Sequence, residues 1–133
     1  MIFLSLIWKL SMHNTNISPH IIVPKGWGHE VWICNNEKYC GKFLVFNPNK
    51  KCSIHFHEIK DEVLYVDKGE ITLLYSWTSK KEDFKKLVLT EGMSFHIPTG
   101  LMHQMIASKK GARIIEFSTH HEDSDSIRIE KGD

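Results

Sequence analysis

Residues 49–69, NKKCSIHFHEIKDEVLYVDKG, decide the fold, because they read as two β-strands that carry an unusual set of polar side chains. His55 and His57 stand two residues apart in a β-prone run, and Glu62 follows five residues later. Side chains at positions i and i+2 leave a strand on the same face. Both imidazoles can therefore contact one object while Phe56 points the other way.

A second stretch, residues 92–103 (GMSFHIPTGLMH), supplies His103 after a turn. Three imidazoles and one carboxylate form a ligand set that suits a first-row divalent metal ion. The hypothesis is therefore a metal site built from His55, His57, Glu62 and His103. This donor set accepts Mn, Fe, Ni, Co or Zn, so it leaves the identity of the metal open.

The composition fits one domain with its own hydrophobic core. The chain has 133 residues, of which 41% are hydrophobic. Lys and Arg number 17 against 16 Asp and Glu, which argues against a protein held on nucleic acid by a general positive field. Three cysteines (Cys34, Cys40 and Cys52) show no CxxC spacing, and we expect small packed thiols in a reducing compartment.

The N-terminal decapeptide MIFLSLIWKL is apolar, but no basic region precedes it and it is far shorter than the ~20 residues that span a bilayer. We interpret residues 1–19 as an N-terminal extension and residues 20–133 as the domain. Met12 is a second candidate for the natural start. A cytoplasmic location is the default expectation, with no membrane partner.

Short β-prone runs separated by turn residues fill the rest of the chain, and no helical period of ten or more residues is found. This pattern predicts an all-β sandwich or small barrel of about ten strands. Lys68-Gly69 is expected to be a tight turn between two strands, and residues 102–108 and 112–118 are expected to be two separate strands. The expected strands cover residues 20–23, 28–34, 38–46, 51–57, 62–67, 70–77, 87–89, 93–97, 102–108, 112–118 and 126–129.

The two histidine stretches resemble the two signature motifs of the cupin superfamily. In the first motif, a glycine precedes the paired histidines, the glutamate and a closing glycine; this chain matches it with Asn49 in place of the leading glycine. Asn is tolerated where that glycine serves a turn with positive φ. The second motif is met by Gly92, Pro98, Gly100 and His103, with Ala107 in place of its final Asn.

The resemblance implies a single-domain jelly-roll β-barrel with a metal near its mouth. The residues that it carries over as ligands are His55, His57, Glu62 and His103. Inward imidazoles without a metal would cost about 1–3 kcal/mol for each unsatisfied buried group. The alternative is a metal-free relic in which the histidines bond to one another or to water.

A narrower resemblance covers most of residues 22–132. Their order is similar to the C-terminal cupin of type II mannose-6-phosphate isomerases and to related sugar-binding cupins of polysaccharide biosynthesis. The matching pieces are residues 25–28 (KGWG), Tyr39 to Lys42, Ile115-Glu116 and Asp125 to Arg128. One departure is that relatives often carry Gln at the position of His55.

An isomerase of this kind needs groups that move a proton and groups that bind an anionic substrate. The proton-shuttle candidates are Glu58, Lys60 and Glu116. The candidate contacts for a phosphate or carboxylate are Lys42 and Arg128. For each of these charged residues, a solvated or ion-paired surface role is the simpler interpretation. For Glu116 the alternative is an inward orientation, because it alternates with Ile115 and Phe117 and shares a face with Ile114.

Three functions remain open on these residues. The first is metal-assisted isomerisation of a sugar phosphate or nucleotide-linked sugar, the second a metal-dependent dioxygenase, and the third a non-catalytic module that binds sugars or other small ligands. We also expect a homodimer, since residues predicted to face outward, such as Trp32 and Phe43, would expose apolar area. His96 and the His120-His121 pair are expected to be structural or solvated.

Overall fold

The computed structural model describes residues 19–133 and contains nine β-strands. Predictions that concern residues 1–18 lie outside the described part of the chain. The strands are β1 (Ile21–Lys25), β2 (Gly28–Asn35), β3 (Cys40–Phe46), β4 (Ile54–His57), β5 (Glu62–Ser76), β6 (Lys85–Thr90), β7 (Ser94–Ile97), β8 (Met102–Ser118) and β9 (Ser126–Glu130).

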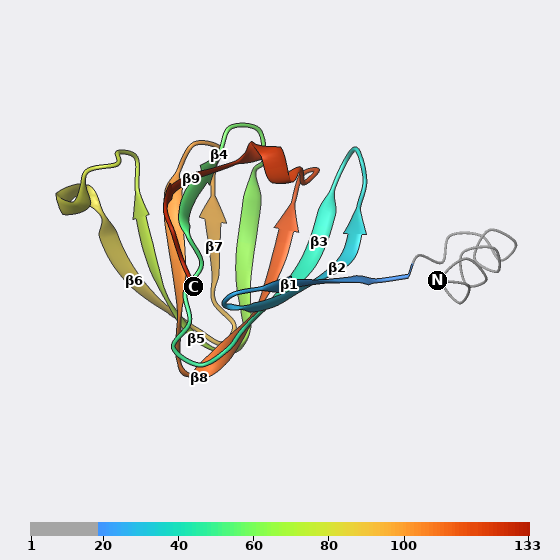
Figure 1. Cartoon of the computed structure of the whole chain (residues 1–133), viewed down its shortest axis with the longest axis horizontal. Coiled ribbons are helices and arrows are strands. Elements are labelled where there is room, and N and C mark those ends of the chain that lie inside the picture. The colour runs from blue at the N-terminus through green and yellow to red at the C-terminus, as the bar shows by residue number, and fades with distance from the viewer. Residues whose placement is uncertain (1–18) are drawn as a thin grey trace, which may run out of the picture.

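All strand pairs are antiparallel, and the two longest strands, β5 and β8, run side by side through the middle of the fold. The second half of β8 and the first half of β5 join β1, β2, β3 and β7 into one layer. The first half of β8 and the second half of β5 join β4, β6 and β9 into the other. The result is the curled, open barrel of Figure 1, which confirms the predicted all-β jelly roll.

The tight turn predicted at Lys68-Gly69 is wrong, and so is the break predicted between residues 108 and 112. Each segment stays in one continuous strand, of 15 residues in β5 and 17 in β8. Pairing between the two strands shifts register on both sides of Gly69. Gly69 and Gly111 both have positive φ, at 77° and 74°, so they bend the strands through a bulge without ending them.

This irregularity changes which side chains face the interior. Before it, the buried residues of β5 include Leu64 and Val66, and after it they include Ile71 and Leu73. In β8 the change runs from odd positions such as His103 to even positions such as Glu116. His103 and Glu116 are 13 residues apart and would lie on opposite faces of a regular strand, but the bulge turns both inward.

The hydrophobic core lies between the two layers and includes Trp27, Phe46, Leu64 and Ile114. Trp27 stacks on Phe46 with ring centroids 4.2 Å apart. Trp32 was predicted to face outward, and this is wrong: the side chain lies over the inward-facing Lys42.

The remaining described segments are loops and two short 3₁₀ turns, at Lys81–Asp83 and Asp123–Asp125. Asn49 has a φ of 62°, so it does adopt the left-handed conformation expected at the motif position that usually holds glycine. Within residues 19–133 no helix is long and apolar enough to cross a membrane.

Candidate metal centre

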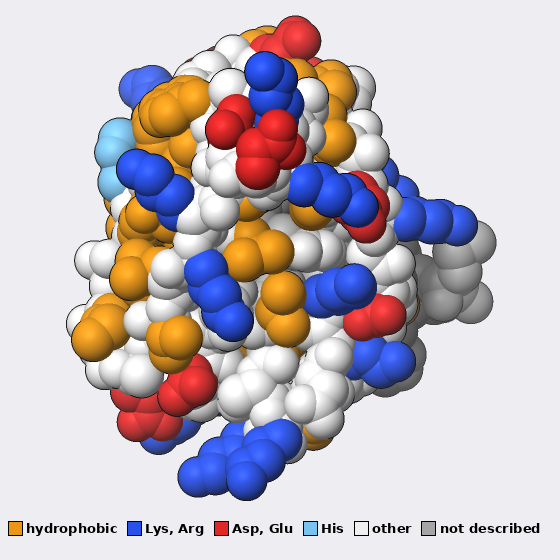
Figure 2. Space-filling model, turned by 90° about the vertical axis from the view of Figure 1, so that its left-hand side faces the viewer, with side chains coloured by type: hydrophobic (Ala, Val, Ile, Leu, Met, Phe, Trp, Pro, Cys, Tyr) orange, Lys and Arg blue, Asp and Glu red, His pale blue; other side chains and the backbone are white. Residues whose placement is uncertain are grey.

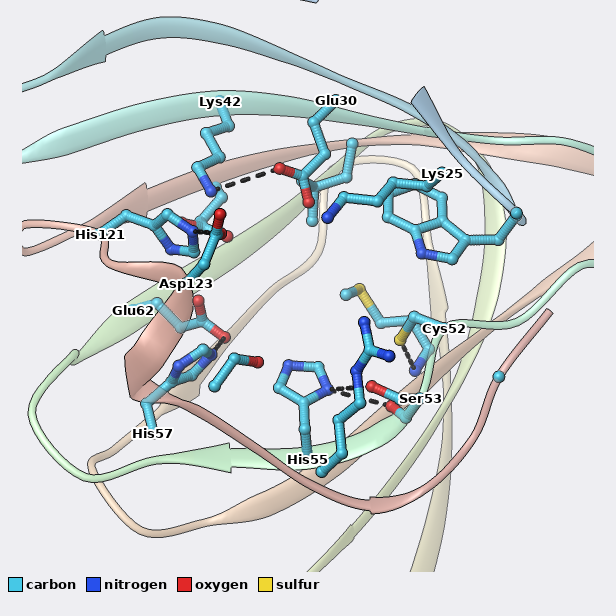
Figure 3. A pocket seen from close by; sticks show the side chains of 18 of the residues that line it. Lys25, Glu30, Lys42, Cys52, Ser53, His55, His57, Glu62, His121 and Asp123 are labelled. Atoms are coloured by element: carbon cyan, nitrogen blue, oxygen red, sulfur yellow. Dashed lines mark hydrogen bonds and ion pairs between the residues drawn. The ribbon is translucent and has the colours of Figure 1, made fainter. Parts of the chain in front are cut away.

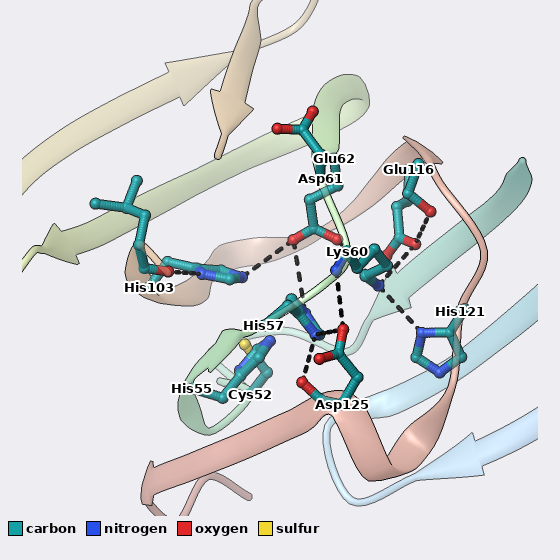
Figure 4. Close-up of polar contacts among 12 residues, drawn as sticks. Cys52, His55, His57, Lys60, Asp61, Glu62, His103, Glu116, His121 and Asp125 are labelled. Carbon is teal, nitrogen blue, oxygen red and sulfur yellow. Dashed lines mark hydrogen bonds and ion pairs between the residues drawn. The ribbon is translucent and has the colours of Figure 1, made fainter. Parts of the chain in front are cut away.

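Three histidines from two strands meet on the inner face of the barrel. His55 and His57 alternate along β4, and His103 stands on β8 directly opposite His55 in the strand pairing. One ring nitrogen from each lies within 4.8 Å of the other two (Figure 4), which places three donors around a common point. Glu62, at the start of β5, adds a carboxylate oxygen 3.1 Å from His103 Nε2 and 4.0 Å from His57 Nε2.

The backbone fixes the tautomer of all three rings. In each, Nδ1 lies within hydrogen-bond distance of a carbonyl oxygen, 3.0 Å from Ser53 for His55, 3.2 Å from Asp125 for His57 and 2.9 Å from Leu101 for His103. A carbonyl only accepts, so each Nδ1 carries a proton, which leaves Nε2 as the nitrogen available to a metal ion. Histidine ligands of metal sites are commonly oriented by such a bond from the other nitrogen.

The buried nitrogen and oxygen atoms of this cluster leave positions open for a cation. His103 Nε2 and Glu62 Oε2 are buried and have no hydrogen-bond partner among residues 19–133. His103 Nε2 lies 3.1 Å from Glu62 Oε1, so a cation bound between them would contact both atoms. His55, His57 and His103 can therefore form a site for a divalent metal ion, with Glu62 beside them as the candidate fourth ligand.

The histidines of β4 stay neutral in this environment. Burial, together with the neighbouring His103 and His57, lowers the pKa of His55 to about 3. Burial also lowers the pKa of His57 to about 4, although Glu62 opposes the shift. Neutral imidazole is the form that binds metals, so these two ligands are ready to bind at neutral pH without losing a proton.

Lys60 lies inside the barrel, and the view that it is simply a solvated turn residue is wrong. Only 3% of Lys60 is exposed, and its Nζ is 3.1 Å from Glu62 Oε2, 3.0 Å from Glu116 Oε2 and 3.1 Å from His121 Nδ1. The Glu62 contact is an ion pair that lacks the alignment of a hydrogen bond, which is why Glu62 Oε2 keeps a free lone pair. The Lys60 ammonium thus joins Glu62, the candidate metal-ligand carboxylate, to the buried carboxylate of Glu116.

The two carboxyls that share the Lys60 ammonium have pKa values shifted in opposite directions. Burial would raise the pKa of Glu62, but Lys60 and the nearby His103 hold it well below its usual value. Burial and the negative charge of Glu62 raise the pKa of Glu116, with Lys60 opposing. Burial would lower the pKa of Lys60, but Glu62 and Glu116 raise it, so the ammonium stays charged. Two carboxyls with diverging pKa values suit different chemical roles.

The turn that delivers Lys60 to the interior is held by Asp125 (Figure 4). Asp125 Oδ1 accepts hydrogen bonds from the backbone N–H of Glu58 and Ile59, and Oδ2 accepts one from Lys60. The Asp125 carbonyl also orients His57. The sequence placed residues 58–61 on a short connection but contained no local signal that a carboxylate 65 residues away would fold it inward.

The site opens on a cavity of about 720 Å³, a size that suits a small-molecule ligand. Lys42, Glu116 and Arg128 line it together with the ligands His55, His57 and Glu62 (Figure 3). Lys42 is 1% exposed, so the solvated role considered for it from the sequence is wrong. Arg128 is exposed on the cavity side of β9, whereas Glu116 is buried and lines the cavity, so the exterior ion pair considered for it is wrong.

Glu58 and His121 differ most from what their sequence context suggested. Glu58 is exposed and does not line the cavity. His121 does line it: Nδ1 accepts a hydrogen bond from Lys60, and Nε2–H donates one of 2.8 Å to Asp123. Burial and the charge of Lys60 lower the pKa of His121. In the sequence it belongs to the polar run His-His-Glu-Asp, which shows no alternation to distinguish it from the partly exposed His120.

The fold and the site together define the class of this protein. It is a small antiparallel β-barrel with three clustered histidines and a carboxylate at its open cavity, a set that could bind a metal ion. The chain belongs to the cupin family, whose sequence pattern matches residues 35–130. The general resemblance expected from the two histidine motifs is therefore confirmed.

Comparison with known proteins finds similarity both in sequence and in structure. D-lyxose ketol-isomerase from Thermofilum sp. (strain ex4484_79) is 31% identical over 122 residues, which cover 76% of this chain and 68% of the relative. KdgF from Halomonas sp. superimposes with a TM-score of 0.65 at 17% identity, covering 84% of this chain and 92% of KdgF.

Two larger proteins contain the same fold as a part. The capsular polysaccharide assembling protein CapF from Staphylococcus aureus matches with a TM-score of 0.73 at 14% identity, and oxalate decarboxylase from Bacillus subtilis with 0.71 at 14%. Each match covers 86% of this chain but only 35% of CapF and 33% of the decarboxylase. At these identities the structural likenesses show the fold alone.

Proposed function

We propose that this protein is a metal-dependent isomerase that interconverts an aldose and a ketose. The observation that carries the proposal is the joining of the metal-ligand carboxylate Glu62 to a second buried carboxylate, Glu116, through Lys60 inside one cavity. The sequence similarity to a D-lyxose ketol-isomerase supports the same reaction class. The sequence-based expectation of a sugar phosphate or nucleotide-linked sugar is a narrower form of this proposal.

Aldose–ketose isomerisation moves a proton between two adjacent carbons and develops negative charge on an oxygen between them. A divalent ion held by His55, His57, Glu62 and His103 supplies Lewis-acid stabilisation of that charge. Glu116 is the group that we assign to the proton transfer, because it is buried, lines the cavity and has a raised pKa. A carboxyl whose pKa is moved toward neutrality both accepts and returns a proton more readily.

Lys60 acts in this proposal by holding the two carboxylates in place. It has three acceptors within about 3.1 Å, so it stays charged and oriented between them. Lys42 and Arg128 line the same cavity and are assigned to substrate binding. Glu58, which is exposed, has no part in this arrangement.

The test is exchange of the substrate C2 proton with D₂O, followed by NMR for a panel of free and phosphorylated aldoses with added Mn(II). We expect exchange and ketose formation with at least one sugar, and a loss of about 10²–10⁴-fold in kcat for Glu116→Gln, the usual contribution of a positioned acid–base group. Glu58→Gln is the matched control and should retain activity. Loss of activity in the control but not in Glu116→Gln would contradict the assignment.

The same experiment separates the two alternative functions. Product formation that persists without O₂ excludes a dioxygenase. If no sugar in the panel exchanges its proton although ligands bind, the isomerase proposal is wrong and a non-catalytic binding module is the better description.

A further inference from the structure

A second polar cluster faces the cavity from the side opposite the histidines (Figure 3), where Lys42 on β3 meets Glu30 on β2. Lys42 Nζ lies 3.4 Å from Glu30 Oε1 and 4.3 Å from the ring centre of Trp32. Both charged residues line the cavity, and Lys42 is 1% exposed. A buried ammonium at this depth normally requires close partners.

The hydrogen-bonding capacity of this pair is only partly used within residues 19–133. The Lys42 ammonium has three N–H donors, and its one hydrogen bond, to Glu30 Oε1, is long at 3.4 Å. Glu30 Oε1 also accepts a bond of 2.7 Å from the Trp32 indole N–H. Glu30 Oε2 receives no hydrogen bond from the described residues and points into the open space of Figure 3. The cluster thus offers one strong donor and one strong acceptor side by side.

A donor beside a carboxylate acceptor matches the hydroxyl groups of a sugar. A hydroxyl both donates and accepts, so it can take a bond from Lys42 and give one to Glu30. A phosphate or carboxylate only accepts, and the negative charge of Glu30 repels it. The wider cavity gives an anion no compensating field from its side chains, because five Lys or Arg and five Asp or Glu residues line it.

We propose that Lys42 and Glu30 form a hydroxyl subsite that selects an uncharged sugar, one with free hydroxyls at the end remote from the metal-ligand histidines. This assignment rests on the proposed function, because that function makes the ligand a sugar. It narrows the substrate class to unphosphorylated aldoses and ketoses. Trp32 positions the pair: its indole N–H holds one oxygen of Glu30, and its ring covers the ammonium of Lys42.

The test uses a ligand that cannot react, so that binding is measured apart from catalysis. A five-carbon alditol, D-arabinitol, has sugar hydroxyls but no carbonyl, and it is titrated by calorimetry into the full chain with Mn(II) added. The matched probe is the monophosphate ester of the same alditol. We expect saturable binding of the alditol that is tighter than binding of its phosphate.

Two substitutions and one control locate the subsite. Glu30→Gln and Lys42→Met should each weaken alditol binding about tenfold or more, the usual effect of losing a hydrogen bond to a charged group. Glu70→Gln, an exposed position on β5, should leave the affinity unchanged. Circular dichroism checks that each variant is folded, and Glu30→Gln decides the matter alone if Lys42→Met does not fold.

Three results would overturn the subsite: no alditol binding to the wild-type chain, unchanged affinity in folded Glu30→Gln, or tighter binding of the phosphate than of the alditol. Failure of the proposed function is seen separately, as an absence of C2 proton exchange while the alditol still binds with the expected dependence on Glu30.

Discussion

Lys60 connects the two halves of the candidate site through a single side chain. On one side it contacts Glu62, which belongs to the metal-ligand set, and on the other Glu116, which we assign to proton transfer. His121 accepts the third N–H and in turn donates to Asp123. Because both carboxylates are buried and close to the same ammonium, their charges are compatible only while Lys60 is present.

Replacement of Lys60 tests this dependence. We predict that Lys60→Met lowers the free energy of unfolding by roughly 3–5 kcal/mol, since removing one partner of a buried ion pair leaves the other charge uncompensated. Urea titration measures the loss, and Lys109→Met, at an exposed position on β8, should be close to neutral. Equal stability of the two variants would mean that the buried network contributes nothing to the fold.

Acid sensitivity of the metal-free protein is a second prediction at this scale. The pKa values of His55 and His57 are lowered to about 3 and about 4, against about 6.5 in an unfolded chain. Between these values the unfolded chain binds protons that the folded chain does not, so the free energy of unfolding should fall as the pH drops from about 6.5 toward 4. Urea titrations in the presence of a chelator measure this slope.

The matched control for the pH slope is the double variant His55→Gln/His57→Gln. It removes both titrating groups, so its stability should vary less across the same pH range. A wild-type stability that stays level from neutral pH to about pH 4 would contradict the neutral, buried histidines described above.

The clustering of the three histidines could be predicted from the sequence, whereas the environment of the lysines could not. Two strand-mates at i and i+2 and a third histidine in a second motif are local patterns. The burial of Lys60 depends on Asp125, and that of Lys42 on Trp32 and Glu30 from a neighbouring strand. Such partners come from pairings between distant segments, which periodicity along one strand does not reveal.

At the scale of single elements, the bulge shared by β5 and β8 does most to build the site. In a regular strand, Glu116 would face outward if His103 faced inward. Glycines with positive φ at 69 and 111 shift the alternation in both strands at once. The sequence predicts a turn at Lys68-Gly69 because glycine is frequent in tight turns. The strand stays continuous because it pairs with β8 through a bulge, and that distant partner cannot be inferred from local sequence.

Substitutions at Gly69 and Gly92 distinguish the cost of steric overlap from the cost of backbone strain. A Cβ at Gly69 would overlap the carbonyl oxygen of Gly111, whereas one at Gly92 meets nothing within 4 Å, although φ is positive at both, 77° and 86°. We predict that Gly92→Ala costs about 1 kcal/mol from backbone strain alone. Gly69→Ala should cost clearly more and should also lower metal content, because the register of Glu62 and His103 depends on the bulge.

Thermal unfolding and elemental analysis of both glycine variants check this prediction. Equal destabilisation by the two substitutions would mean that the strands can move apart at the bulge, and that the overlap with Gly111 is relieved without loss of the site.

At the scale of the whole molecule, the surface over β6 suggests self-association. Figure 2 shows hydrophobic side chains gathered among lysines on this side of the barrel. Trp77, Leu87, Val88 and Met93 are large apolar residues that are 39–65% exposed. We predict a homodimer in which this surface is partly covered, since exposed apolar area often marks an interaction site.

Sedimentation analysis at high and low protein concentration measures the mass. Val88→Glu on β6 should shift the chain toward monomer, whereas Ile59→Glu, at an exposed single position on the turn after β4, should not. A wild-type chain that stays monomeric at the highest concentration would contradict the predicted dimer.

A bound metal ion should stabilise the whole fold, because its ligands come from three strands. His55 and His57 belong to β4, Glu62 to β5 and His103 to β8. Of these strands, β4 pairs with β8 at a single position and with β9 along its length, so it has the weakest connection to the rest of the sheet. An ion that links β4 to β5 and β8 replaces pairings that the backbone does not make.

We therefore predict that Mn(II) or Zn(II) raises the melting temperature relative to protein with a chelator, with a gain near 2.7 kcal/mol when the free metal is about 100 times its dissociation constant. His57→Ala should lose this gain and its bound metal, whereas His96→Ala, which removes an exposed side-chain contact with Asp61, should retain both. An equal gain in His57→Ala would move the stabilising site away from the barrel interior, toward the exposed pair of His120 and Glu122.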